Sequence, residues 1–372
     1  MYVILLILLF FYINSNKVVE QEYINRGIPV AAFGFNKGTY AGVNYLNTYY
    51  NISRMPYSFY GEESINQEKV IDSQVKIPEY YMCVHYKDDV NVNTYDISVT
   101  LHFYLTKFYA RFQTYLGLGL AFKFNNEQYS YVHQLYNEKL INYRAFAFIP
   151  DKDIEKGKIV YGKENNDNYP YSGYCNVEDS HFTWGCNLTR IIYDNKDYSI
   201  NLYAMFVSIS PVFFESKIIV NFMKDILLKD KFEDSTCVLL SNSFLNNRIQ
   251  CKAMFMEDIN KNITFVFGDL KISFNINLLF NRMTDNLYSI FYYKDEPTYK
   301  IDTDNNIIIG FPFITLFNTT IFDYEQKRII FYSDTITTEV HSSNPYIKLI
   351  IITNIIQLFL SIIINIGNKL YK

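Results

Sequence analysis

Few side chains in this sequence have the types and spacing that chemistry requires. No two cysteines show the C-x-x-C spacing of a zinc site, and the histidines are scattered along the chain. They are His85, His102, His133, His181 and His341. The sequence contains no Ser-His-Asp or Cys-His arrangement and no phosphate-binding glycine loop. It therefore predicts no metal site and no cofactor.

Carboxylates are the remaining candidates for acid–base chemistry. Two carboxylates that face each other share one proton, so that one acts as a base toward water and the other as an acid. Asp72, in the run KVIDSQ at residues 69–74, is followed by Ser73, whose hydroxyl can brace a tight turn. The alternative interpretation is an ordinary exposed Asp-Ser turn. The other acidic residues lie in polar settings typical of a solvated surface: Glu62, Glu63, Asp88, Asp89, Asp225, Asp230 and Asp234.

Two apolar runs that lead into a glycine indicate how such residues would be positioned. The first is YLGLGLAF at residues 115–122, with Gly117, and the second starts at residue 307 as IIIGFPF, with Gly310. A glycine in a buried strand is typical of a place where another backbone approaches closely. The second run continues as two β-rich segments around the polar turn 323–327, which predicts a hairpin.

The remaining pattern predicts a mainly β protein. The chain is 49% hydrophobic and 18% aromatic, a composition too apolar for disorder and favourable to strands. Period-two alternation predicts a strand at residues 96–105, and helical spacing predicts short helices at 129–141 and 214–228. Strands flanking polar turns are expected at 145–161 and 262–276.

These elements, from about residue 66 to residue 331, resemble the pepsin-like aspartic peptidases. In that family each of two lobes carries a catalytic Asp-Thr/Ser-Gly and, later, an apolar-apolar-Gly strand. The motif GKIVYG at residues 157–162 is similar to one that closes the family's first lobe. The resemblance implies a bilobal, mainly β pepsin-like fold with a few short helices, which binds peptide or protein in the cleft between the lobes.

The resemblance also implies that the catalytic signatures are damaged. In AMFVSISP at residues 204–211, Ser208 keeps the turn-bracing hydroxyl, but Val207 stands in place of the second catalytic aspartate. Valine cannot hold a proton, and the β-branched Ile209 resists the conformation of the glycine that it replaces. In the first lobe Asp72 and Ser73 match the signature, and Gln74 replaces its glycine.

Spacing predicts that the first lobe is truncated. Asp72 precedes Gly117 by 45 residues, whereas Val207 precedes Gly310 by 103. We therefore expect a reduced flap, the hairpin that in this family closes over substrate. The leading hypothesis is a catalytically inactive, monomeric peptide-binding protein. Two alternatives remain open, namely an active aspartic endopeptidase that works at acidic pH and a decaying gene product whose first lobe does not fold.

Apolar segments near both ends of the sequence predict where the protein is located in the cell. Residues 2–13 form an apolar run typical of a secretory signal peptide, with an N-terminal signal anchor as the alternative. Residues 349–366 carry no charge, and Lys369 and Lys372 follow, which predicts a membrane anchor and a short cytoplasmic tail. A lipid-anchor signal or a packed terminal helix are the alternatives. A net charge of −4 without a basic block disfavours nucleic-acid binding.

The expected division of the chain follows from these segments. It runs signal peptide 1–16, short prosegment or N-terminal extension 17–44, first lobe 45–165, second lobe 166–336, spacer 337–348, anchor 349–366 and tail 367–372. The protein is then expected in the secretory pathway, as a single-pass protein of the cell surface or endomembranes, and otherwise as a secreted protein.

The cysteines and the glycosylation sequons agree with an expected entry into the secretory pathway. Cys175–Cys186 and Cys237–Cys251 would each close a short loop in an oxidising compartment, which leaves Cys83 over. Four Asn-x-Ser/Thr sequons are plausible glycan acceptors on the surface of a secreted chain. They lie at Asn51, Asn187, Asn262 and Asn318.

Overall fold

The structure is a computed structural model that describes most of the chain between residues 17 and 334. The described backbone comprises residues 17–25, 29–32, 40–44, 51–53, 68–77, 81–92, 97–106, 115–117, 131–152, 156–165, 168–178, 184–206, 213–214, 221–240, 247–252, 261–284, 287–292 and 306–334. Side chains are described for residues 17–23 and for most of these segments from residue 131 onward.

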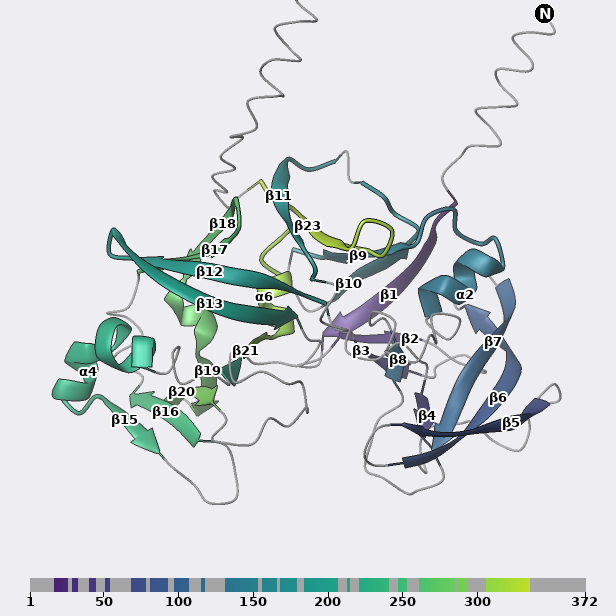
Figure 1. The fold of residues 1–372 in the computed structure, drawn as a ribbon, viewed down its shortest axis with the longest axis horizontal. Coiled ribbons are helices and arrows are strands. Elements are labelled where there is room, and N and C mark those ends of the chain that lie inside the picture. The colour runs from purple at the N-terminus through teal and green to yellow at the C-terminus, as the bar shows by residue number, and fades with distance from the viewer. Residues whose placement is uncertain are drawn as a thin grey trace, which may run out of the picture. The chain divides into compact units, whose positions relative to one another are not determined.

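Strands from both ends of the described chain form one sheet of 13 strands (Figure 1). In spatial order they are β11 (Tyr171–Asn176), β23 (Arg328–Tyr332), β22 (Thr319–Asp323), β9 (Ala145–Pro150), β10 (Lys156–Tyr161), β1 (Val19–Asn25), β2 (Pro29–Ala32), β3 (Tyr40–Asn44), β8 (Tyr115–Gly117), β4 (Asn51–Ser53), β7 (Ile97–Thr106), β6 (Tyr81–Val92) and β5 (Glu68–Ile77). The six strands from β11 to β1 pair antiparallel throughout.

A second sheet is built from the later part of the chain. In spatial order its strands are β15 (Cys237–Leu240), β16 (Asn247–Lys252), β20 (Leu287–Tyr292), β14 (Phe213–Phe214), β21 (Asn306–Ile309), β13 (Lys196–Phe206), β12 (Gly185–Tyr193), β17 (Asn262–Phe267) and β18 (Leu270–Asn275), with β19 (Asn281–Thr284) paired to β20. The long β12–β13 hairpin lies between β21 and β17 in this sheet.

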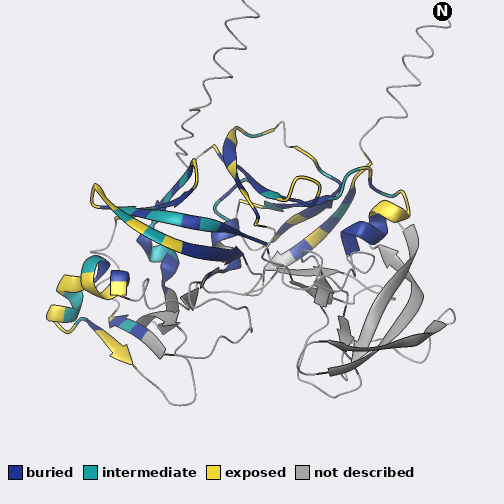
Figure 2. Cartoon of the chain, viewed as in Figure 1, coloured by how far each residue is buried: buried dark blue, intermediate teal, exposed yellow. Residues whose placement is uncertain are grey.

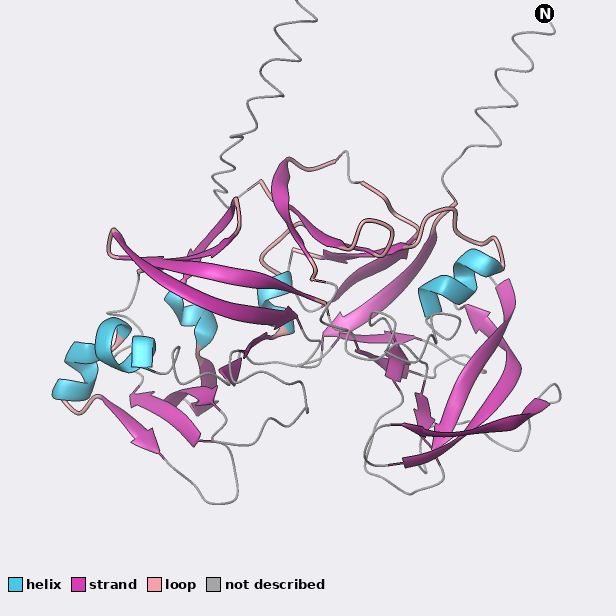
Figure 3. Ribbon diagram, viewed as in Figure 1, coloured by secondary structure: helices cyan, strands magenta, loops and turns pink. Residues whose placement is uncertain are grey.

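Helices are short wherever the structure describes them (Figure 3). They are α2 (Tyr131–Asn137), a π-helical turn (Met223–Leu227), α4 (Lys229–Glu233), a 3-10 turn (Ile276–Leu279) and α6 (Phe311–Ile314). None of them is long and apolar enough to span a membrane. Residues 1–16 and 337–372, including the apolar segment 349–366, lie outside the described residues.

Three neighbouring strands of this sheet, β9, β22 and β23, are mostly buried on both faces (Figure 2). On β9, Phe146 and Phe148 point into the main core, while Ala145 and Ala147 belong to a smaller cluster on the other face. This follows from the two-residue period of a strand. The main core is rich in rings, and Phe146 stacks on Phe322 with their centroids 4.6 Å apart.

Most of the elements predicted from local pattern are confirmed. The turn 151–157 joins β9 to β10, the hairpin 262–276 is β17–β18, and the hairpin around 323–327 is β22–β23. The predicted helix at 214–228 is wrong at its start, because Phe214 pairs with Ile307 of β21 as part of a strand. Residues 17–44, expected as a prosegment or extension, contribute β1, β2 and β3 to the large sheet.

Candidate functional site

In the second sheet, the strand that precedes Gly310 is inserted between two strands that follow one another in the sequence. β21 lies between β13 and β14, since Phe206 of β13 pairs in parallel with Ile309 and Phe213 of β14 pairs antiparallel with Ile308. Gly310 follows β21 directly and is buried at the start of α6. The segment 207–212, with Val207 and the turn-bracing candidate Ser208, joins β13 to β14 and lies outside the described residues.

The first half of the chain repeats this arrangement with the Gly117 strand. Asn44 of β3 pairs in parallel with Gly117 of β8, and Asn51 of β4 pairs antiparallel with Tyr115 of the same strand. β8 therefore lies between β3 and β4, as β21 lies between β13 and β14. The segment 45–50 joins β3 to β4, and it too lies outside the described residues.

Asp72 and Ser73 lie in a different part of this sheet. Both are inside β5, the last strand at one edge, and the register between β5 and β6 shifts between Lys69 and Gln74. Their side chains are outside the described residues. Because β8 lies between β3 and β4, the segment 45–50 that joins those strands is the counterpart of the segment 207–212. The sequence pattern had assigned no role to residues 45–50.

That segment reads YLNTYY, so an apolar residue precedes Asn47 and Thr48. The order apolar residue, short polar residue, hydroxyl residue is the signal that points to it. Counted from Asn47, 70 residues lead to Gly117, compared with 45 from Asp72. The shortening of the first lobe is smaller on this count.

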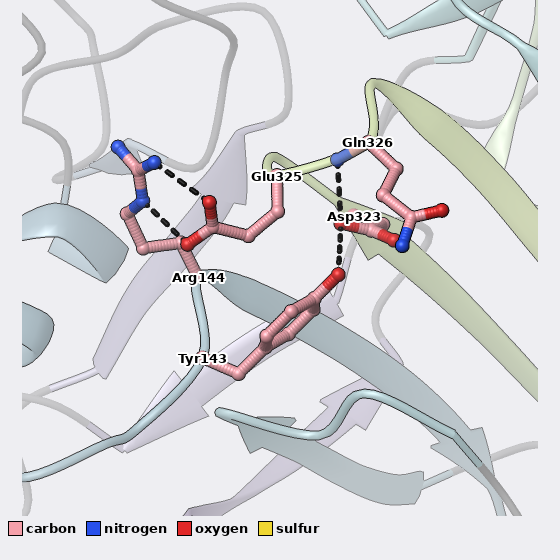
Figure 4. A network of polar contacts seen from close by, with 5 residues as sticks. All are labelled: Tyr143, Arg144, Asp323, Glu325 and Gln326. Carbon is pink, nitrogen blue, oxygen red and sulfur yellow. Dashed lines mark hydrogen bonds and ion pairs between the residues drawn. The ribbon is translucent and has the colours of Figure 1, made fainter.

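Among the described carboxylates, Asp323 is the deeply buried one, with no exposed side-chain area. Figure 4 shows it beneath the turn between β22 and β23. Its carboxylate accepts hydrogen bonds from the Tyr143 hydroxyl at 2.9 Å, the Gln326 backbone N–H at 3.0 Å and Arg328 Nε at 3.0 Å. Burial and this bond to Asp323 raise the pKa of the Tyr143 hydroxyl.

A second carboxylate on the same turn is also fully engaged. Arg144 donates from Nε and from one terminal nitrogen to the two oxygens of Glu325, each at 2.8 Å (Figure 4). These hydrogen bonds from Arg144 hold the pKa of Glu325 below its ordinary value. Both carboxylates therefore brace the turn through hydrogen bonds, and this structural use does not place them to transfer protons to a substrate.

The cysteines and sequons occupy defined places in the described part of the chain. Cys175 of β11 is joined to Cys186 of β12, and Cys237 of β15 to Cys251 of β16. Both predicted disulfides are thereby confirmed, while the Cys83 side chain is outside the described residues. No group of three or more potential metal ligands occurs among the described residues. The sequon asparagines lie in β4 (Asn51), in β12 (Asn187), at the start of β17 (Asn262) and just before β22 (Asn318).

Comparisons with known proteins bear on this arrangement. A model of the eukaryotic aspartyl protease family matches residues 84–333. A comparison with curated protein sequences finds no match. Among solved structures, the crystal structure of the aspartic proteinase from Irpex lacteus is similar, with a TM-score of 0.62 and 13% sequence identity over 88% of this chain and 99% of that chain.

Proposed function

The chain belongs to the eukaryotic aspartyl protease family and has its mainly β, pepsin-like fold, and we propose that it is a catalytically inactive member that binds peptide or protein. The binding region is the part of the molecule where the family binds peptide, the cleft between the two lobes. No cofactor and no second copy of the chain is invoked.

One observation carries this proposal. β8, which ends at Gly117, and β21, which Gly310 follows directly, each lie between two strands that are joined by a six-residue segment. The segments read YLNTYY at 45–50 and VSISPV at 207–212, and neither contains an aspartate or a glutamate. This arrangement makes the two segments equivalent, and within them Thr48 follows Asn47 as Ser208 follows Val207, which supports Asn47 as the first-lobe counterpart of Val207 in place of Asp72.

The chemistry of these residue types argues against peptide hydrolysis. An amide is neutral and valine has no polar atom, so no proton can be shared and no water can be activated between them. Thr48 and Ser208 keep the hydroxyl that follows each catalytic position in the family. Tyr49 and Ile209 stand where the family has glycine, and their side chains add bulk there.

Absence of an acidic pair also bears on binding. An aspartate dyad changes its protonation between acidic and neutral pH, which makes the affinity for a peptide depend on pH. With Asn47 and Val207 at these positions, we expect affinity to change less than threefold between pH 4 and pH 7, beyond any titration of the peptide itself.

Peptide capture tests the proposed function. The purified full chain is incubated with a degenerate peptide library at pH 4 and at pH 7, and bound peptides are identified by mass spectrometry. Recovery of intact, enriched peptides at both pH values supports the proposal. Recovery of cleavage products that disappear in the Asp72→Ala variant would instead establish the alternative, an active endopeptidase that uses Asp72.

The location of the protein is a separate proposal. The apolar segments at residues 2–13 and 349–366 support entry into the secretory pathway and attachment to a membrane, and two disulfides suit an oxidising compartment. Fractionation of cells that express the full chain tests it. We expect the protein in the membrane pellet after alkaline washing, and recovery in the soluble fraction would contradict the anchor.

A further inference from the structure

Strand β17 presents the sequon at Asn262 to solvent. Asn262 is exposed and Thr264 is half-buried, while Ile263 and Phe265 between and after them are enclosed in the core. The two residues that define the sequon therefore share the outward face of the strand, as the two-residue period requires.

Asn262 also lies at an open end of the sheet. Its partner in β18 is Asn275, whereas the pairing of β17 with β12 begins only at Ile263. One side of Asn262 is thus free of the neighbouring strand β12. A group attached to the Asn262 side chain can therefore extend into solvent without displacing a paired strand.

The two other sequons with described side chains are placed less favourably. The Asn187 amide nitrogen donates a hydrogen bond to Glu178, and the hydroxyl of Thr189 donates to the Val266 carbonyl at 3.1 Å. The Asn318 side chain accepts from the Asp334 backbone N–H at 3.1 Å. Both residues that follow it, Thr319 and Thr320, are fully buried.

We propose that Asn262 is a glycosylated residue of this protein and carries an N-linked oligosaccharide. The oligosaccharide comes from a lipid-linked diphosphate donor. The bond between its first sugar carbon and the diphosphate oxygen breaks, a bond from that carbon to Asn262 Nδ2 forms, and Nδ2 gives up one proton. Carbon and nitrogen keep their oxidation states, so the transfer needs no further reactant. The proposal rests on the proposed entry of the chain into the secretory pathway and does not depend on whether the chain cleaves peptides.

The test uses the full chain expressed in a eukaryotic cell with a secretory pathway. Enzymatic removal of N-linked glycans converts a modified asparagine into aspartate, and mass spectrometry of the peptides that span residue 262 measures occupancy. Two variants provide matched controls. Thr264→Val preserves the shape and β-branching of the side chain but abolishes the sequon, whereas Thr264→Ser retains it.

We expect most wild-type and Thr264→Ser molecules to be modified at Asn262, and Thr264→Val to lose one glycan. The occupancy of Asn262 should be at least twice that of Asn318. Glycans at Asn187 or Asn318 with Asn262 unmodified would overturn the proposal, and so would a chain that is recovered in the membrane fraction without any glycan. The wild-type measurement decides the matter even where a variant fails to fold.

Discussion

Asp323 shows how a buried carboxylate can serve structure rather than catalysis. Its side chain is fully enclosed, and it receives three hydrogen bonds at 2.9–3.0 Å from Tyr143, Gln326 and Arg328. A carboxylate with these partners holds the turn between β22 and β23 against the residues that lead into β9. An acidic residue that works as a proton carrier needs access to its substrate, and the fully buried side chain of Asp323 offers no such access.

Removal of this carboxylate should be costly. Asp323→Ala leaves the Tyr143 hydroxyl and the charge of Arg328 without their buried partner, and we expect the free energy of unfolding to fall by about 3 kcal/mol. Denaturant unfolding measures the loss. Asp197→Ala is the control, since the Arg190–Asp197 ion pair is exposed and should contribute less than about 1 kcal/mol. Equal losses in the two variants would contradict this view of Asp323.

Glu325 predicts a pH dependence of stability. Because its folded-state pKa is depressed by Arg144, Glu325 stabilises the folded protein above the pKa of the unfolded chain, and that contribution is lost as the pH falls through the folded pKa. Glu325→Gln should therefore lower the melting temperature more at pH 7 than at pH 3. A melting temperature lowered equally at both pH values would show that the charge is not the cause.

At the scale of elements, the two glycines of the GKIVYG motif are required by close backbone contacts. A Cβ on Gly157 would lie 2.5 Å from the Ile149 carbonyl oxygen, and one on Gly162 would lie 2.7 Å from that of Lys17. Gly162 also has φ +86°, in the region that favours glycine. These contacts fix β10 between β9 and the start of β1.

Two glycines with positive φ allow the steric effect to be separated from the conformational one. Gly162→Ala should lower the free energy of unfolding by about 1 kcal/mol because of the positive φ. The clash of the new Cβ with Lys17 and Ile141 should lower it by about a further 1–3 kcal/mol. Gly268 lies in the β17–β18 turn at φ +61°, with open space around it. Gly268→Ala should therefore lower the free energy of unfolding only by the contribution of the positive φ, about 1 kcal/mol. Thermal unfolding compares them, and a larger loss for Gly268→Ala would refute the close packing of Gly162.

Local sequence pattern was sufficient to predict the antiparallel hairpins. It was insufficient to predict that β8 and β21 are each inserted between two other strands. The β17–β18 and β22–β23 hairpins could be predicted because alternation and turn residues are adjacent in the sequence. The β3–β8 pairing joins Gly42 to Tyr115, and β8 and β4 are only three residues long. Such short strands with distant partners carry no periodic signal of their own.

The same limitation applies to the candidate site. A search for an aspartate followed by a hydroxyl residue finds Asp72, and it cannot find a position at which the aspartate has been replaced. Val207 could be proposed because the residues before it, through Phe206, resemble the family frame. Asn47 became a candidate only once the neighbours of β8 were known.

At the scale of the whole molecule, the chain has the family fold, and we propose that the two catalytic positions of that fold carry neutral residues. The ring-rich core remains closed, with Trp184 and Phe146 fully buried and their ring centroids 5.9 Å apart. Two disulfides tie β11 to β12 and β15 to β16. Stability and chemistry reside in different residues, so the aspartates can be lost while the fold is retained.

Peptide-bond cleavage by the purified full chain is the most direct test of this account. The assay runs from pH 3 to pH 7 on a broad peptide library, with and without a transition-state-mimicking inhibitor of aspartic peptidases, and mass spectrometry detects new termini. A variant that carries Asn47→Asp, Tyr49→Gly, Val207→Asp and Ile209→Gly is tested in parallel. We predict no inhibitor-sensitive cleavage by the wild type at any pH, and acid-dependent cleavage, if any, only by the variant. Inhibitor-sensitive cleavage by the wild type would contradict the account, because it requires a carboxylate pair that the segments 45–50 and 207–212 do not contain.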